Sequence, residues 1–243
     1  MAATSNDLPL SVRVRLPGQA DEVVSPWSEI STGTLGVAVP WRTFRFYQGQ
    51  NHYSGSFWSA TVGDLVLYES RLELARLLFA DFDPSVRHIV AQPFLLHADI
   101  EGRVRRHVPD YLLLTDSTPV VVDVKPSRRA TAPTVARTLV WTRRAVESRG
   151  WRYEVWTEPA AVELANVRLL AGYRRPWLFG QAVVDELRTA DLNGVTLGEA
   201  FRALPTQAPD VARAVVLHLL WRQHFRVDLS RPLGATTVLR VAS

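Results

Sequence analysis

The chain has 243 residues, 47% of them hydrophobic, and a formal net charge of +4 at pH 7, so it can bury a core as one large domain or two small ones. It contains no cysteine, which excludes disulfides, thiolate zinc sites and cysteine nucleophiles. The N-terminus lacks the apolar core of a signal peptide, and no apolar run approaches a membrane-spanning length. We therefore expect a soluble cytoplasmic protein with no membrane partner, whose pI of about 9.8 suits a polyanion.

The first forty residues carry weak structural signals, because prolines punctuate them and only "VRVRL" (12–16) indicates a short strand. We expect residues 1–40 to form a loosely structured N-terminal arm. The run "WRTFRFY" (41–47) alternates large apolar and basic side chains and predicts a strand. A turn and a second strand are expected in "NHYSGSFWS" (51–59).

Residues 68–83 carry a stripe of leucines that predicts a helix. Three strand-like runs follow, separated by turn signals, at 87–99, 103–115 and 119–126. A helix at 133–150 and a strand at 151–159 complete a β-α-β crossover, which favours parallel pairing of its two strands. Residues 41–160 are thus expected to form an α/β domain with a mixed central sheet flanked by helices.

Beyond Pro159 the pattern becomes helical, and we treat 161–243 as a smaller second domain. Helices are expected at 160–175, 177–191, 196–205 and 208–224, and two short strands at 225–243. This order of helices followed by a hairpin is that of a winged helix-turn-helix. A helical lid that only packs on the first domain is the alternative.

Two carboxylates and one amine are expected to converge at one end of the apolar sheet. Asp123 and Lys125 project from the same side of their strand, about 6.6 Å apart, because side chains alternate between the two faces. Asp110 opens the preceding strand, and the short turn between the strands favours antiparallel neighbours. Two ionised carboxylates repel each other, and a divalent cation with a preference for hard oxygen ligands resolves this repulsion. The alternative is that Asp110 caps a turn and Lys125 ends a strand.

Lys125 is the only lysine among the 28 lysine and arginine residues. A compact ammonium can contact the attacking water or a phosphate oxygen at a point position, whereas a guanidinium is planar and always charged. We therefore expect Mg²⁺ or Mn²⁺ as cofactor and a catalytic role for Lys125. The bound metal would lower the pKa of a water and neutralise charge in phosphoryl chemistry.

Glu73 has two interpretations. In "SRLE" (70–73) it completes a capping box, a purely structural motif. In a nuclease it would face the metal from the helix that precedes the sheet. Glu69, one turn earlier, is a possible accessory acid or only a favourable charge at the helix start.

Pro109-Asp110 followed by Asp123-Val124-Lys125 is the P-D…(D/E)-x-K pattern of restriction-endonuclease-like nucleases. Together with "SRLELA", "IVAQPFLL" and "VKP", it resembles the TnsA-like endonuclease subunit of heteromeric transposases over about residues 40–160. Carried over by position, the family's catalytic Glu, metal-binding Asp and catalytic Lys fall on Glu73, Asp110 and Lys125. The chain has Asp123 where some members of the family have Gln.

The resemblance implies a restriction-endonuclease-like core and a C-terminal winged-helix-like domain that meets the partner transposase or DNA. It implies cleavage at the 5′ ends of a mobile element, while a DDE-type transposase cuts the 3′ ends; an ATPase regulator is a further candidate partner. A stand-alone nuclease of restriction, repair or phage defence and a silent DNA-binding adaptor remain alternatives. The candidate catalytic residues are Glu73, Asp110, Asp123 and Lys125. The candidate metal ligands are Glu73, Asp110, Asp123 and Val124. The candidate accessory residues are Glu69 and Gln92.

Basic side chains flank this cluster and could contact DNA phosphates; the ordinary alternative is solvated loop charge. They are Arg103, Arg105 and Arg106 before it and Arg128 and Arg129 after it. Trp41, Arg42, Phe44 and Arg45 interleave aromatic and basic side chains, as in nucleic-acid-binding surfaces or a half-buried edge strand. The six histidines are scattered, and we expect only ordinary packing or surface roles for them.

Overall fold

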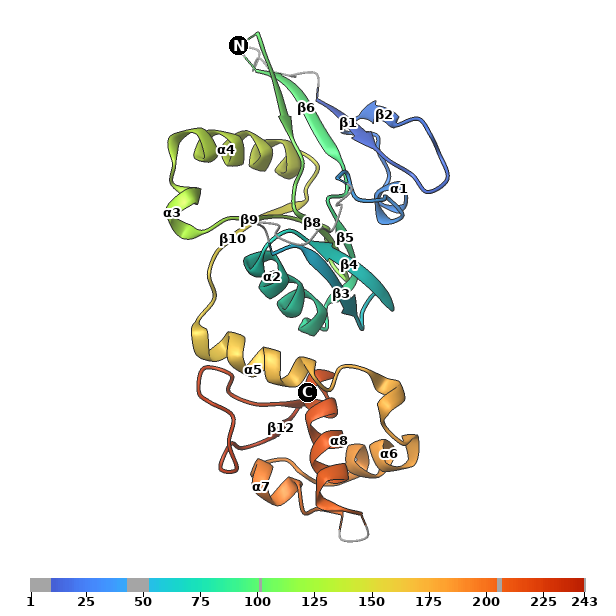
Figure 1. The fold of residues 1–243 in the computed structure, drawn as a ribbon, viewed down its shortest axis with the longest axis vertical. Coiled ribbons are helices and arrows are strands. Elements are labelled where there is room, and N and C mark those ends of the chain that lie inside the picture. The colour runs from blue at the N-terminus through green and yellow to red at the C-terminus, as the bar shows by residue number, and fades with distance from the viewer. Residues whose placement is uncertain (1–9, 43–52, 101, 205–206, 243) are drawn as a thin grey trace, which may run out of the picture. The chain divides into compact units, whose positions relative to one another are not determined.

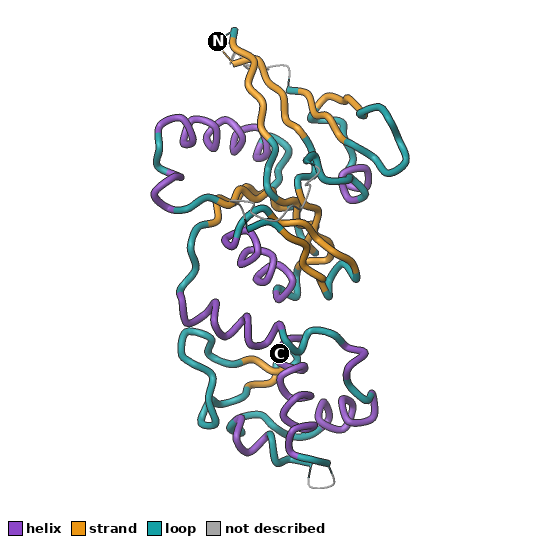
Figure 2. The backbone as a smooth tube through the Cα atoms, viewed as in Figure 1, coloured by secondary structure: helices purple, strands orange, loops and turns teal. Residues whose placement is uncertain are grey.

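The computed structural model describes residues 10–42, 53–100, 102–204 and 207–242. The chain divides into two compact units, which we describe separately (Figures 1 and 2). Unit 1 comprises Met1–Ala80 and Ser85–Glu158, and unit 2 comprises Asp81–Pro84 and Pro159–Ser243. The mixed α/β architecture of the chain is compatible with an α/β nuclease fold. No helix among the described residues is long and apolar enough to cross a membrane.

The central sheet of unit 1 contains the strands expected around the carboxylates. Its strands, in spatial order, are β10 (Arg152–Trp156), β9 (Val120–Val124), β8 (Tyr111–Thr115) and β5 (Val86–Ala91). β9 pairs with β10 in parallel and with β8 antiparallel, which confirms both predicted pairings. Every residue of β9 is buried, which explains why all of its residues except Asp123 are valine.

Helices cover both faces of this sheet (Figure 1). α4 (Pro133–Glu147) packs on the face that carries Val121 and Tyr153, in one buried cluster with them. α2 (Arg71–Phe82) lies on the other face, where Phe79 packs against Trp156. The short α3 (Ser127–Ala130), which the sequence did not predict, follows β9 directly.

A second sheet overturns the expectation of a loosely structured N-terminal arm. Its strands, in spatial order, are β2 (Val23–Pro26), β1 (Ser11–Val14), β6 (Leu95–Ile100) and β7 (Arg103–His107). Val12, Val14 and Trp27 are buried in the core of unit 1, as is Leu35 of α1 (Thr32–Gly36). Burial of these side chains and the bond from Trp27 Nε1 to the main-chain oxygen of Ala145 (2.6 Å) fix the segment.

Two of the three predicted strand runs are each broken into two strands. The run 87–99 divides at Gln92, whose φ of 46° leaves the extended region, and at Pro93. The run 103–115 divides at Pro109, which has no N–H to donate to a sheet. In both cases the chain passes from one sheet to the other, so the predicted position was right and the predicted continuity was wrong.

A hairpin of β3 (Gly55–Ser59) and β4 (Asp64–Tyr68) precedes α2. β3 confirms the second predicted strand, whereas β4 was not predicted. The strand predicted at 41–47 falls mainly on residues outside the described ranges, as do Phe44 and Arg45.

Unit 2 contains the predicted helices and a small sheet. Its elements are α5 (Ala161–Ala171), a short 3-10 helix (Pro176–Leu178), α6 (Gln181–Thr189), α7 (Leu197–Ala200), α8 (Pro209–Trp221), β11 (Phe225–Arg226) and β12 (Arg240–Val241). β11 and β12 pair antiparallel, and Thr196 forms an isolated bridge with Val238. α8 is the central helix, because every residue from Val215 to Trp221 is buried.

Candidate active site

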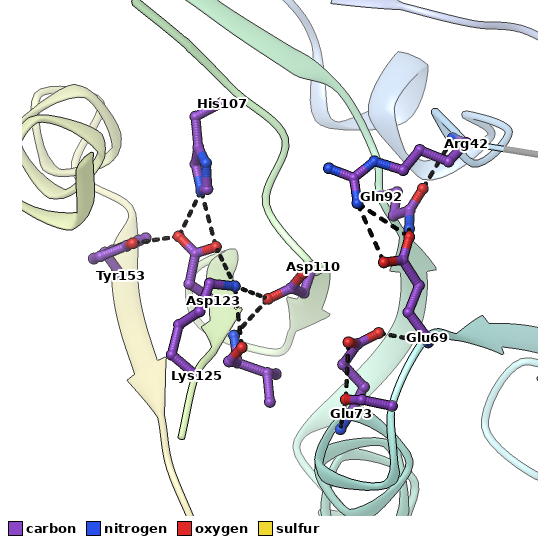
Figure 3. Close-up of polar contacts among 11 residues, drawn as sticks. Arg42, Glu69, Glu73, Gln92, His107, Asp110, Asp123, Lys125 and Tyr153 are labelled. Carbon is purple, nitrogen blue, oxygen red and sulfur yellow. Dashed lines mark hydrogen bonds and ion pairs between the residues drawn. The ribbon is translucent and has the colours of Figure 1, made fainter. Parts of the chain in front are cut away.

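Lys125 lies at the end of β9, where its ammonium meets three oxygen atoms (Figure 3). Nζ is 2.8 Å from Asp110 Oδ2 and 3.0 Å from the main-chain oxygen of Val124. Asp123 Oδ1 is 3.7 Å from the same nitrogen. The sequence therefore predicted correctly that these charged groups converge, although their chemical roles stay a prediction.

The β8–β9 pairing positions Asp110. Tyr111 lies opposite Val122, and the N–H of Asp110 donates to the main-chain oxygen of Val122 (3.0 Å), which extends the pairing by one residue. Asp110 Oδ2 also accepts a 2.6 Å hydrogen bond from the N–H of Val124. The antiparallel register thus brings two carboxylates to neighbouring positions at one sheet end, where like charges destabilise the pairing.

The charges of the cluster influence one another. Burial raises the pKa of Asp110 above its usual value, and the negative charge of Asp123 adds to this, in spite of the opposing ammonium of Lys125. Burial disfavours the ammonium of Lys125, yet the two carboxylates raise its pKa. Lys125 is therefore charged in this arrangement and balances the acidic groups.

Asp123 is held by two side chains that the sequence did not single out. His107 Nε2 lies 2.8 Å from each carboxylate oxygen of Asp123, and the hydroxyl of Tyr153 donates a short hydrogen bond to Oδ2. Burial alone would raise the pKa of Asp123, but these contacts and Lys125 hold it below the usual value. His107 was expected to have only an ordinary packing or surface role, and it both packs on Trp141 and contacts the candidate site residue Asp123.

The positions of these two partners follow from the sheets. Tyr153 on β10 is aligned with Val121, so it shares the α4 face of the sheet with Asp123. His107 ends β7, and its ring packs edge-on against Trp141 of α4 (6.2 Å). Because the side chain of Asp123 is fully buried, these donors supply the contacts that a buried carboxylate needs. The β9–β10 register was a usable signal for Tyr153, but nothing in the sequence placed His107.

Glu73 caps the start of α2, but its carboxylate accepts from the N–H of Glu69 and not, as a capping box requires, from that of Ser70. Ser70 Oγ accepts from the N–H of Glu73 (3.1 Å) and donates to Oε1 (2.9 Å), and Oε2 accepts from the N–H of Glu69 (2.7 Å). Burial raises the pKa of Glu73 to about 7, and the negative charge of Asp110 adds to the increase. Figure 3 shows Asp110 between Glu73 and the Asp123–Lys125 pair. Glu73 therefore caps α2 and also lies within the field of the cluster.

Glu69 and Gln92 form a neighbouring polar group with Arg42. Glu69 accepts from Arg42 Nη1 (3.2 Å) and from Gln92 Nε2 (2.5 Å). Gln92 Oε1 in turn accepts from the N–H of Arg42 (2.9 Å). The left-handed backbone of Gln92 costs about 1–3 kcal/mol for a residue other than glycine. These residues support the end of the β5 strand and the start of α2, and none of them contacts Lys125 in the described part of the chain.

The basic residues are exposed on two elements. Arg103 and Arg105 alternate with Val104 on β7 and therefore share the face of His107, whereas Arg106 points to the opposite face. Arg128 and Arg129 lie on α3, directly after Lys125 and Pro126. Their contact with DNA stays a prediction.

Residues 83–158 match the family model described as TnsA-like endonuclease N terminal. This segment is similar to a TnsA-like endonuclease N-terminal domain. The match covers less than half of the chain and includes Asp110, Asp123 and Lys125, while Glu73 lies before it. The TnsA-like segment corresponds to the part of unit 1 from β5 to β10. A comparison with curated proteins found no match.

Proposed function

We propose that this TnsA-like protein is a divalent-metal-dependent DNA endonuclease, and that it acts as the subunit of a heteromeric transposase that hydrolyses the 5′ ends of a mobile element. The supporting observation is the cluster of Asp110, Asp123 and Lys125 at the end of β8 and β9. The TnsA-like match over the same strands supports a nuclease associated with a transposase.

The donor atoms of the cluster suit Mg²⁺ or Mn²⁺. Among the described residues, no group of three or more histidine or acidic side chains is arranged to hold a metal ion. Mg²⁺, however, is commonly bound through one or two carboxylates with water completing its shell. The Lys125 ammonium already places one positive charge among Asp110 Oδ2, the Val124 main-chain oxygen and Asp123 Oδ1. These are hard oxygen donors, and a cation of higher charge would bind the same groups.

Asp110, Asp123 and the main-chain oxygen of Val124 would therefore hold the metal. Glu73 is a further candidate ligand, and each of its carboxylate oxygens accepts one hydrogen bond at the start of α2, which leaves a lone pair on each for a metal. When bound, the metal would lower the pKa of a water molecule and neutralise charge on the phosphoryl group.

The protein's own residues would have separate roles in hydrolysis. Lys125 has a flexible side chain, so its ammonium can turn from the carboxylates to a phosphate oxygen or to the attacking water. His107 and Tyr153 would hold the carboxylate of Asp123 in one orientation (Figure 3). They act as positioning residues, since neither reaches the reacting atoms in this role.

Unit 2 supports the proposal of a winged-helix module. The order is α6, the Thr196 segment that bridges to Val238, α7, α8 and the β11–β12 pair. That is the element order of a winged helix-turn-helix, in which a short strand between the first helices joins the hairpin. In this proposal the module binds DNA or the DDE-type transposase that cuts the 3′ ends, and an ATPase regulator is a further partner.

A cleavage assay on element-end DNA tests the proposal. The protein is incubated with Mg²⁺, with and without the candidate transposase, beside an Asp110→Ala variant. We expect cuts at the 5′ ends that require Mg²⁺, depend on Asp110 and increase with the transposase. Cleavage of any duplex without the transposase would instead indicate a stand-alone nuclease. No cleavage under either condition would contradict the proposed activity.

A further inference from the structure

A groove in unit 2 lies between the two arms of the segment that joins β11 to β12. Its volume is about 660 Å³. The groove, which we call the arginine groove, is lined by Arg226, Val227, Asp228, Arg231, Pro232, Thr236, Thr237, Val238 and Arg240. Three of these residues are cationic and one is anionic, so the lining is basic and polar.

Two arginines that line the groove oppose each other directly. Arg226 and Arg240 are cross-strand partners of β11 and β12, and like charges at such positions destabilise a sheet. Within the described part of the chain, neither guanidinium has an ion-pair partner. Arg231 lies 3.8 Å from Asp228, in a pair whose side chains are exposed. An anion bound between the arginines would remove this repulsion.

Hydrogen bonds fix the main chain around the groove, although the guanidinium groups of its arginines are exposed. The buried Asn166 of α5 donates to the main-chain oxygens of Leu229 (2.9 Å) and Arg231 (2.7 Å) and accepts from the N–H of Leu233 (3.2 Å). These three bonds hold one arm of the segment.

Main-chain pairing holds the other arm of the groove. The N–H of Leu239 donates to Val195 (2.8 Å), and that of Leu197 donates to Thr237 (2.8 Å). A Cβ on Gly198 would lie 3.0 Å from the main-chain oxygen of Ala235, so this close approach favours glycine. The arginines therefore extend from a preorganised surface, and binding would not have to order the loop.

The neighbouring helix α8 exposes side chains only in its first half, among them Asp210, Val211 and Arg213. α8 is buried on all sides from Val215 to Trp221, so its second half has no free face to enter a DNA groove. The arginine groove, by contrast, gathers three cationic side chains around the hairpin.

We propose that the arginine groove binds the phosphate backbone of duplex DNA, with Arg226 and Arg240 as its two principal contacts. This inference rests on the proposed function only for the identity of the anion as DNA. A guanidinium suits phosphate because its planar N–H groups form paired, charge-assisted hydrogen bonds. Backbone contacts of this kind give affinity and register without reading sequence.

The test is equilibrium binding of the full chain to a labelled duplex in EDTA, where no metal-dependent cleavage occurs, over about 50–200 mM salt. Each lost phosphate contact lowers the slope of log affinity against log salt by about 0.9. The double variant Arg226→Ala/Arg240→Ala should therefore lose about 1.8 from the slope, and Arg226→Lys/Arg240→Lys should retain most of it. Arg188→Ala, which removes a cation of α6 that pairs with Asp185, should leave the slope unchanged.

Asp228→Asn should change DNA affinity in the opposite direction. It removes the only acidic side chain of the lining but keeps an oxygen for the bond from the N–H of Ser230, so DNA should bind more tightly. Misfolding would not produce this gain, and melting temperatures of all variants check the fold.

An unchanged slope and affinity in the double alanine variant would overturn the inference. So would loss of transposase binding with DNA binding intact, because the groove would then recognise an acidic protein surface. Failure of the proposed nuclease has a different signature. Absence of Mg²⁺-dependent cleavage, with the slopes changed as expected, would leave DNA binding by the groove in place.

Discussion

At the scale of single residues, Lys125 is the one lysine in a chain that otherwise uses arginine. Its ammonium makes separate contacts with Asp110, Val124 and Asp123 within 3.7 Å. A guanidinium is larger and planar and does not release its proton. We expect Lys125→Arg to lower single-turnover cleavage by about 10²-fold or more, while DNA affinity at one salt concentration stays close to wild type. Arg129→Lys on exposed α3 is the matched reverse exchange and should be silent. Cleavage by Lys125→Arg within a few-fold of wild type would refute the catalytic role.

His107 and Tyr153 should act through Asp123. Residues that hold a metal ligand commonly contribute about 10- to 100-fold to metal affinity. We therefore expect His107→Gln and Tyr153→Phe to weaken Mn²⁺ binding by that order in calorimetry. His97→Gln is a control, because His97 lies on β6 opposite Arg106, on the face away from His107. A fall in melting temperature with unchanged Mn²⁺ affinity would show that both residues serve stability alone.

Glu73 should make the stability of the apo-protein depend on pH. Its pKa is about 7 in the folded chain against an ordinary value of 4.5, so the folded state binds more protons between these pH values. Its stabilising contribution is complete below about pH 4.5 and is lost as pH rises through 7, by at most about 3 kcal/mol. Glu73→Gln should therefore gain stability relative to wild type between pH 5 and pH 8, measured by denaturant unfolding in EDTA. An equal difference at both pH values would argue against a raised pKa.

The sequence predicted the charged cluster better than it predicted the residues that hold the cluster in place. Strand alternation put Asp123 and Lys125 on one side, and a short turn put Asp110 beside them. His107 reaches Asp123 from a different sheet, and no local pattern encodes that contact. For Glu73, a local motif was visible in the sequence, namely the capping motif. The burial of its carboxylate beside Asp110 was not visible.

At the scale of elements, periodicity predicted where strands lie but not which sheet they join. The crossover through α4 fixed the parallel pairing of β9 and β10. The runs that became β5–β6 and β7–β8 cross between two sheets at Gln92 and Pro109. A short strand was predicted at 12–16, where β1 lies, but its place in a sheet was not predicted, because Val12 pairs with the distant Leu96 and no local pattern encodes that pairing.

The β6–β7 hairpin separates its arginines by face, which yields an internal control. Arg105 is paired with the buried Ala98, and His107 is paired with the buried Leu96. Arg103 and Arg105 therefore lie on the same face of the hairpin as His107, which contacts Asp123. Arg106 pairs with His97 on the other face. We expect Arg103→Ala/Arg105→Ala to lower both cleavage and the salt slope of DNA binding, by about 0.9 per contact. Arg106→Ala should change neither measurably, and an equal loss in Arg106→Ala would mean that the hairpin acts only through its total charge.

At the scale of the whole molecule, the candidate catalytic residues and the arginine groove belong to different units. Glu73, Asp110, Asp123, Lys125 and their partners His107 and Tyr153 all belong to unit 1. The arginine groove belongs to unit 2, which also includes residues 81–84 at the end of α2. Metal binding should therefore depend on unit 1 alone, whereas DNA binding should draw on both units.

A fragment of residues 1–158 tests this division. The fragment keeps every candidate metal ligand, so its Mn²⁺ affinity should equal that of the full chain. It loses the ring of Trp221, which packs against Phe82 at 5.2 Å, so Phe82→Ser should be introduced to limit exposure of apolar surface. Full-length protein with Phe82→Ser is the control for that exchange.

The fragment should differ from this control in its interactions with DNA and the transposase. Without Arg226 and Arg240, the salt slope should fall by about 1.8, and stimulation by the transposase should disappear if unit 2 is the docking module. The measurements are calorimetry with Mn²⁺, the salt series with a labelled duplex, and cleavage with and without the transposase. A fragment that retains the full slope and the full stimulation would remove both functions from unit 2. A fragment that melts like unit 1 of the control but no longer binds Mn²⁺ would show that the metal site needs the second unit.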